Sequence, residues 1–123
     1  MPMFKISNSK HNFDLEERTY QFAKRCRDYV KKLPKNISNI EYGKQLIRSS
    51  GSQAANYIEA NESLSKKNFI MRVKISKKET KESRLWLRLT QPLKEEEKEQ
   101  QTLIQEANEL MKIFGSIVEG KKK

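Results

Sequence analysis

Few side chains in this sequence have the types and spacing that catalysis or metal binding requires. Glu79 and Glu82 lie three residues apart, so on a helix they would share a side, either as a catalytic pair or as ion-pair partners of cations such as Arg48. Ion pairing is the preferred interpretation. Di-iron bundles need inward-facing Glu-x-x-His pairs, and the single histidine, His11, precedes the predicted bundle. We therefore expect no metal and no cofactor.

Nucleophilic catalysis lacks its parts as well. Cys26, the single cysteine, falls on an apolar helical stripe, so we interpret it as a core residue rather than a reactive thiol. No Ser-His or Cys-His couple can be assembled within the predicted bundle. The segment Arg48-Ser49-Ser50-Gly51-Ser52 is a poor substitute for a Gly-x-x-x-x-Gly-Lys phosphate loop. An enzyme is not expected.

A row of cations is the strongest functional signal. Residues 65–93 hold nine lysines and arginines against two glutamates, in a chain of net charge +10. Six of these cations share one sector of a predicted helix, with no acid among them. This set, called the basic stripe below, comprises Lys67, Lys74, Lys77, Lys81, Arg84 and Arg88.

Such a stripe has two interpretations. Aligned cations can contact phosphates, which gives salt-dependent binding with little sequence preference. The stripe contains no aromatic residue for base stacking, so duplex or structured RNA would suit it better than a single strand. The alternative is a solvated face that only keeps an oligomer soluble.

The elements that position these residues are predicted to be helices. Three prolines and four glycines in 123 residues are too few for a turn-rich β fold, and the length fits one domain. The chain is 35% hydrophobic and 34% charged, a balance that favours long amphipathic helices in a bundle or an oligomer. No apolar run approaches the ~20 residues of a membrane span, and a lone cysteine fits a reducing compartment. We expect no membrane association and a cytoplasmic location.

The periodicity of apolar residues predicts an all-α, antiparallel, up-down-up-down four-helix bundle. Its helices are expected at about residues 14–32, 39–62, 66–90 and 95–119. The bundle would occupy residues 13–120, between a flexible arm at 1–12 and a basic tail at 121–123. Helix starts are predicted from Asp14 with Glu17, from Ser38 with Glu41 and from Ser65, and the last stop from Gly120.

Residues 46–60 are unusually rich in small side chains. One interpretation is a continuous helix, and the rival is a loop at Ser50-Gly51-Ser52 that could hold an anion. Glycine inside a helix costs roughly 1 kcal/mol relative to alanine, which tight packing can offset, so we predict the continuous helix. It is expected to bury Ile40, Ile47, Tyr57 and Ile58 and to nest on a narrow stripe of the third helix made of Phe69, Val73, Ser76, Thr80, Ser83 and Leu87.

The third helix has a second side that is largely apolar. One bundle core can cover only one of its two apolar sides, so the second is predicted to be a subunit interface. The predicted interface residues are Met71, Ile75, Glu79, Glu82, Leu85, Trp86 and Leu89.

Four motifs between residues 13 and 118 carry a family resemblance. They are Phe13-Asp14-Leu15-Glu16-Glu17-Arg18-Thr19, Gly43-Lys44-Gln45-Leu46-Ile47-Arg48-Ser49-Ser50-Gly51-Ser52, Ala55-Asn56-Tyr57-Ile58-Glu59-Ala60 and Lys81-Glu82-Ser83-Arg84-x-Trp86-Leu87. The sequence resembles the bacterial four-helix-bundle family named after open reading frames in 23S ribosomal RNA intervening sequences. The resemblance implies a homopentameric ring and supplies no catalytic residues. Relatives include accessory proteins of diversity-generating retroelements, basic pentamers that bind nucleic acid and a reverse transcriptase.

The sequence is compatible with three functions. The first is a non-enzymatic, oligomeric protein that binds structured RNA or other nucleic acid through the basic stripe. The second is a ring-shaped scaffold for a protein partner, with the charge serving solubility alone. The third is an enzyme that uses Glu79 and Glu82, which requires those carboxylates to face an open pocket.

Overall fold

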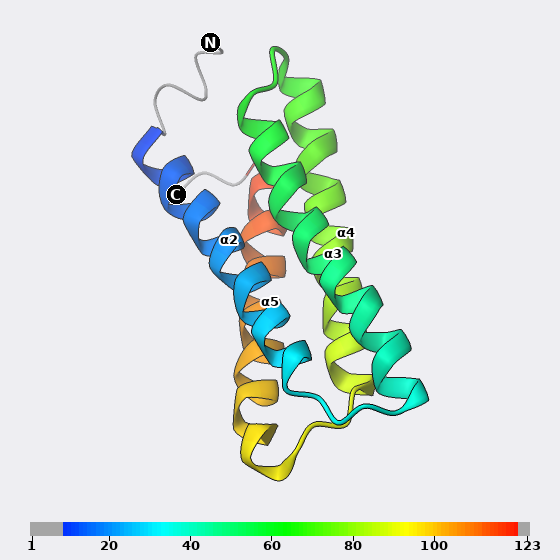
Figure 1. Cartoon of the computed structure of the whole chain (residues 1–123). Coiled ribbons are helices and arrows are strands. Elements are labelled where there is room, and N and C mark those ends of the chain that lie inside the picture. Colours follow the sequence, from blue (N-terminus) through cyan, green and yellow to red (C-terminus); the bar gives the residue numbers. More distant parts are fainter. Residues whose placement is uncertain (1–8, 121–123) are drawn as a thin grey trace.

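The described residues form a bundle of four α-helices that run alternately in opposite directions (Figure 1). The computed structural model describes the backbone of residues 9–120 and the side chains of residues 15–120. The helices are α2 (Ser9–Lys31), α3 (Ile37–Asn61), α4 (Lys66–Leu89) and α5 (Glu97–Glu119), and the short 3-10 helix η1 (Lys94–Glu96) precedes α5. The described part of the chain has no strand. The predicted all-α, antiparallel four-helix bundle is confirmed.

Two predicted helix starts are wrong. The first helix begins at Ser9, so Asp14 lies within it and residues 9–12 belong to it. The expected arm and tail otherwise fall on residues 1–8 and 121–123, outside the described residues. α3 begins at Ile37 because Asn36, in extended conformation, caps it: the Asn36 side-chain oxygen accepts the Asn39 backbone N–H at 2.9 Å. Asparagine caps a helix as well as serine does.

Two other predicted helix ends are confirmed. Ser65 caps α4, since its hydroxyl oxygen accepts the backbone N–H of Asn68 at 3.1 Å. Gly120 caps the end of α5 directly after Glu119, and its φ of 67° is left-handed and therefore suits glycine.

α3 is continuous through Ser50-Gly51-Ser52, so the helix prediction is confirmed and the anion-loop alternative is wrong. The serine side chains find partners inside the bundle: Ser49 and Ser83 are 2.7 Å apart between their hydroxyl oxygens, across α3 and α4. The hydroxyl of Ser76 donates to the backbone oxygen of Gln53 at 2.9 Å. Small polar residues thus let α3 and α4 approach closely without leaving these hydroxyls unpaired.

The predicted stripe of α4 is buried throughout: Phe69, Val73, Ser76, Thr80, Ser83 and Leu87 are at most 9% exposed. The prediction for α3 is correct only for Tyr57, because Ile40, Ile47 and Ile58 are 45–46% exposed. The helix instead turns Leu46, Ser49, Ser50 and Gln53 inward. The side-chain nitrogen of the buried Gln53 donates to the backbone oxygens of Thr19 and Ser50, which satisfies the donor half of its amide.

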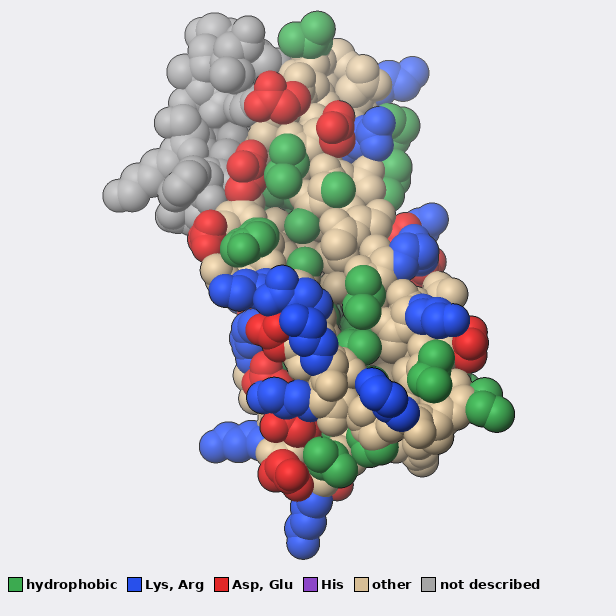
Figure 2. Space-filling view, in the orientation of Figure 1, with side chains coloured by type: hydrophobic (Ala, Val, Ile, Leu, Met, Phe, Trp, Pro, Cys, Tyr) green, Lys and Arg blue, Asp and Glu red, His purple; other side chains and the backbone are tan. Residues whose placement is uncertain are grey.

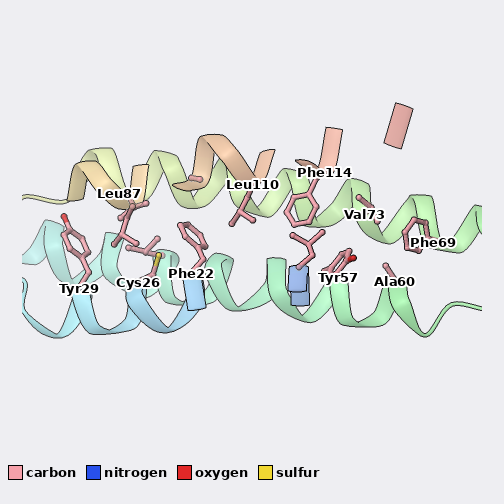
Figure 3. Packing of buried hydrophobic residues seen from close by; sticks show 14 of the residues in the cluster. Phe22, Cys26, Tyr29, Tyr57, Ala60, Phe69, Val73, Leu87, Leu110 and Phe114 are labelled. Atoms are coloured by element: carbon pink, nitrogen blue, oxygen red, sulfur yellow. The ribbon is translucent and has the colours of Figure 1, made fainter. Parts of the chain in front are cut away.

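The apolar core extends along the bundle axis (Figure 3). Phe22, Cys26 and Tyr29 enter it from α2, and Leu110 and Phe114 from α5. The rings of Tyr57 and Phe114 lie 6.0 Å apart between centroids. All four helices therefore share one core, which fixes the orientation of α4 and its outward-facing cations.

Candidate nucleic-acid interface

The basic stripe lies on α4, beside α5. Its members recur at intervals of seven, as in Lys67, Lys74, Lys81 and Arg88, so they occupy one sector of the helix. Five of the six are exposed, and Arg84 is half-buried. The structure therefore brings the predicted cations together on one side of one helix.

Among residues 15–120, these cations have no acidic partner, whereas Arg18 and Arg25 of α2 do. Arg18 binds Glu106 through two hydrogen bonds of 2.7 and 2.9 Å, and Arg25 binds Glu99 at 3.2 and 3.1 Å, joining α2 to α5. Figure 2 shows Lys and Arg intermixed with Asp and Glu on the face that α2 and α3 form. In residues 15–120, no carboxylate lies within 4.0 Å of a charged nitrogen of the stripe. The charge of the stripe is therefore not neutralised locally.

Within residues 15–120, Arg84 is the member of the stripe that another side chain holds by a hydrogen bond. Its Nη1 donates a hydrogen bond to the side-chain oxygen of Asn108 on α5, at 2.6 Å. A guanidinium has five N–H donors, so this bond orients the group and leaves other donors available.

A groove of about 680 Å³ lies between α4 and α5 and adjoins the stripe. This α4/α5 groove is lined by Lys77, Arg84, Gln105, Asn108, Met111, Lys112, Gly115, Ser116 and Glu119. The α5 residues of this lining were absent from the sequence prediction. The polar face of that helix, with Asn108, Lys112 and Ser116 spaced at intervals of four, was a signal that could have indicated them.

Glu79 and Glu82 are ion-pair partners of Arg48. One guanidinium nitrogen of Arg48 lies 3.3 Å from Oε1 of Glu79 and 3.1 Å from Oε1 of Glu82. Glu79 is only 7% exposed and does not face an open pocket with Glu82 as a catalytic pair would. The preferred interpretation, ion pairing between α3 and α4, is confirmed, and the condition set for the enzyme hypothesis is not met.

Cys26 is a core residue, as predicted, and is completely buried. Burial raises the pKa of its thiol well above the ordinary range, so the thiolate that a nucleophile requires is disfavoured. Across residues 15–120, no three side chains of the types that bind metals are grouped as a site. The side chain of His11 lies outside the described residues.

The predicted subunit interface divides into two parts. Met71, Leu85 and Leu89 are 40–46% exposed on the outer face of α4, and Ile75 and Glu82 are partly exposed. Glu79 and Trp86 instead face α3: the Trp86 ring stacks on Tyr42 with centroids 5.8 Å apart. The seven-residue spacing of Glu79 and Trp86 places both toward the neighbouring helix. Whether the outer residues contact another subunit stays a prediction.

The fold and the site define an all-α four-helix-bundle protein with one face of cations that have no acidic partner within residues 15–120. Within this class, the chain belongs to the 23S rRNA-intervening sequence protein family, whose model matches residues 11–116. The resemblance inferred from the motifs is thus confirmed.

A solved structure from Bacteroides thetaiotaomicron VPI-5482 has a similar fold. It is a protein of unknown function from the S23 ribosomal protein family, 26% identical to this chain, with a TM-score of 0.70. The match covers 84% of this chain and 96% of that one. No curated protein matches the chain. Neither the family nor this neighbour is described as enzymatic. None of the described helices combines the length and the apolar character needed to cross a membrane.

Proposed function

We propose that this protein is a non-enzymatic, basic, oligomeric bundle that binds structured RNA or other nucleic acid through the basic stripe, as an accessory factor in the cytoplasm. One observation carries the proposal: the stripe has no carboxylate partner in residues 15–120, whereas Arg18 and Arg25 are paired with Glu106 and Glu99. A face of unpaired cations attracts polyanions, and phosphates supply the missing negative charge.

The ligand class follows from what the stripe lacks. Single-strand binding relies on aromatic side chains that stack on bases, and the stripe contains none. Trp86, the aromatic residue of α4 outside its buried core stripe, already stacks on Tyr42. A ligand with regularly presented phosphates, such as an RNA hairpin or a duplex, therefore fits better than an unstructured strand.

The test is filter binding of a labelled RNA hairpin to the full-length protein across a salt series. The variant Lys74→Glu, Lys77→Glu, Lys81→Glu should abolish detectable binding, and the wild-type affinity should fall as salt rises. The control carries the same charge change on another part of the bundle: Lys24→Glu, Lys31→Glu, Lys35→Glu replaces three exposed lysines. An α4 variant that binds as well as wild type would refute the proposed site.

Assembly into a homopentamer is a second part of the proposal, and its number comes from the family resemblance alone. Its physical support is the set of apolar side chains that one subunit leaves exposed on α4, Met71, Leu85 and Leu89. A ring joins two different faces of each subunit, so a repeated stripe would multiply a weak contact through effective concentration. Sedimentation tests the assembly by comparing the wild type with a variant in which all three residues are changed to Ser. If the variant has the same oligomer size as the wild type, the proposed interface is refuted.

The alternative is a protein-interaction scaffold with no nucleic-acid role. The observation that favours it is a separate row of half-exposed isoleucines on α3, Ile40, Ile47 and Ile58. A reverse transcriptase is the partner that the family resemblance suggests. A co-purification that survives nuclease treatment and fails after Ile47→Ser would support the scaffold, and loss of the partner on nuclease treatment would support a nucleic-acid bridge.

A further inference from the structure

We propose that the α4/α5 groove seats the sugar–phosphate backbone of a nucleic-acid strand, so that α5 supplies half of the binding site. The inference rests on the proposed function and specifies where on the protein the nucleic acid binds. The basic stripe alone is a convex line of side chains along one helix. The groove beside it is concave and has cations on both walls.

The charges of the lining favour a phosphate strand. Lys77 and Arg84 come from α4 and Lys112 from α5, against one lining carboxylate, Glu119. Lys77 and Arg84 are two turns apart, about 10.5 Å along the helix axis. This wall is therefore long enough to contact more than one phosphate of a strand that lies along it. Cations on opposite walls can neutralise the same strand from two sides.

Competition from protein carboxylates at Lys112 is weak. The Lys112 amine lies 3.9 Å from a carboxylate oxygen of Glu109, and both side chains are well exposed. Glu109 also accepts a hydrogen bond from the side chain of Gln105 at 2.8 Å. An exposed pair at this distance is worth little, so Lys112 can turn to a phosphate at small cost.

Gly115 leaves room in the groove for the side chain of Lys77. A β-carbon at this position would stand 3.4 Å from Nζ and 3.8 Å from Cε of Lys77, so the lysine lies directly over the glycine. The exposed Lys77 side chain therefore reaches across from α4 to α5, where a phosphate in the groove would meet its amine. A large side chain at position 115 would occupy the same space without altering any charge.

Arg84 is oriented for the same ligand by Asn108. The 2.6 Å bond from Nη1 to the Asn108 side-chain oxygen ties the guanidinium to the α5 wall. Asn108 is a positioning residue here, because it acts through Arg84. The fork of remaining N–H donors matches the oxygens of a phosphate.

The first test is Lys112→Glu in the full-length protein, assayed with an RNA hairpin in a salt series. Lys112 lies outside the basic stripe, so binding by the stripe alone predicts little change. If the groove binds the strand, the affinity should fall by about tenfold. The slope of log affinity against log salt should also become shallower by about one, because one phosphate contact is lost. The control is Lys98→Glu, another exposed lysine of α5, which lines a different hollow with Arg25.

The results distinguish failure of the groove site from failure of the proposed function. If Lys112→Glu binds like Lys98→Glu while the triple α4 variant loses binding, the groove is refuted and the stripe stands. If the triple α4 variant keeps its affinity, the proposed function itself is refuted.

The second test fills the groove. Gly115→Leu should weaken hairpin binding by about tenfold through steric exclusion, with the fold intact because leucine is a better helix former than glycine. Gly115→Ala is the matched control, since its β-carbon makes ordinary contacts with Lys77. Circular dichroism confirms that both variants are folded. Wild-type affinity in folded Gly115→Leu would overturn the groove site.

Discussion

Arg48 of α3 donates a hydrogen bond from Nη2 to Oε1 of Glu79 on α4, at 3.3 Å, and so partners a carboxylate that is only 7% exposed. The same nitrogen reaches Glu82 at 3.1 Å. One cation thus joins the two helices that pack most extensively, and it accounts for both glutamates that the sequence offered as a catalytic pair.

Arg48→Ala should lower the free energy of unfolding by about 1–3 kcal/mol, because it leaves the buried Glu79 without this partner. Arg27→Ala is the matched control: Arg27 pairs with Asp28 where both side chains are about half exposed, so the expected loss is below about 1 kcal/mol. Urea denaturation measures both. Equal losses would contradict a special role for the Arg48 pair.

Leu46 and Ile47 are neighbours in sequence with opposite surroundings, at 0% and 46% exposure. Leu46→Ala should cost about 2–5 kcal/mol through lost burial and a cavity. Ile47→Ala should cost less than about 1.5 kcal/mol within the subunit, because much of its surface is already in contact with solvent. Thermal unfolding that ranks the two variants in the reverse order would invalidate the corrected inward face of α3.

Gly43 and Gly51 both lie within α3 but differ in the space around them. A β-carbon at Gly51 would meet nothing within 4 Å, so Gly51→Ala should stabilise the protein by about 0.5–1 kcal/mol through helix propensity. At Gly43 it would lie 3.0 Å from Cγ1 of Val30, whose branched side chain cannot easily turn away. Gly43→Ala should therefore be at least about 1 kcal/mol less stable than Gly51→Ala in denaturant titrations.

Alkaline pH should destabilise the bundle through buried groups whose pKa is raised by burial, among them Tyr57 and Cys26. Burial raises the pKa of Tyr57 to about 12, partly offset by a hydrogen bond with Asn61, from an ordinary value of 10.0. Burial also raises the pKa of Cys26 above its ordinary value of 9.0. The unfolded chain loses these protons first, so the stabilisation is fully present below about pH 9 and falls as the pH rises from there to about 12.

Denaturation midpoints measured across this pH range check the effect. Cys26→Ala removes the thiol contribution, so the decline should begin closer to pH 10, the ordinary pKa of Tyr57. A midpoint that stays constant up to pH 12 would contradict the assignment of both groups as buried and protonated.

The predictions from sequence agree best with the structure where a local pattern is compatible with only one local conformation. The core stripe of α4 repeats at helical spacing, and Ser65 and Gly120 act through their own local backbone, so each was predictable. The first helix was predicted too short because Asp14 and Glu17 have the spacing of a capping box, which indicated a start at Asp14. No residue between Ser9 and Asp14 prevents the helix from beginning earlier, and it begins at Ser9. At the start of α3, two residues that lie two positions apart could serve as caps, and Asn36 rather than Ser38 caps the helix.

The sequence by itself determined the helical class, the number of helices and the gathering of the cations on one helix, because periodicity, caps and charge are local properties. Only the tertiary structure decided the limits of the inward side of α3, which includes Leu46 and Gln53 and excludes Ile47. Hydrophobicity favoured Ile47, yet Gln53 is buried, where Thr19 and Ser50 accept its hydrogen bonds, and Ile47 stays at the surface.

The tertiary structure likewise decided that Glu79 is bound to Arg48 and that Lys112 joins Lys77 at one groove. Each of these relations links residues more than thirty positions apart in the chain. Such proximity depends on how the helices pack, and it cannot be predicted from the spacing of residues along one helix.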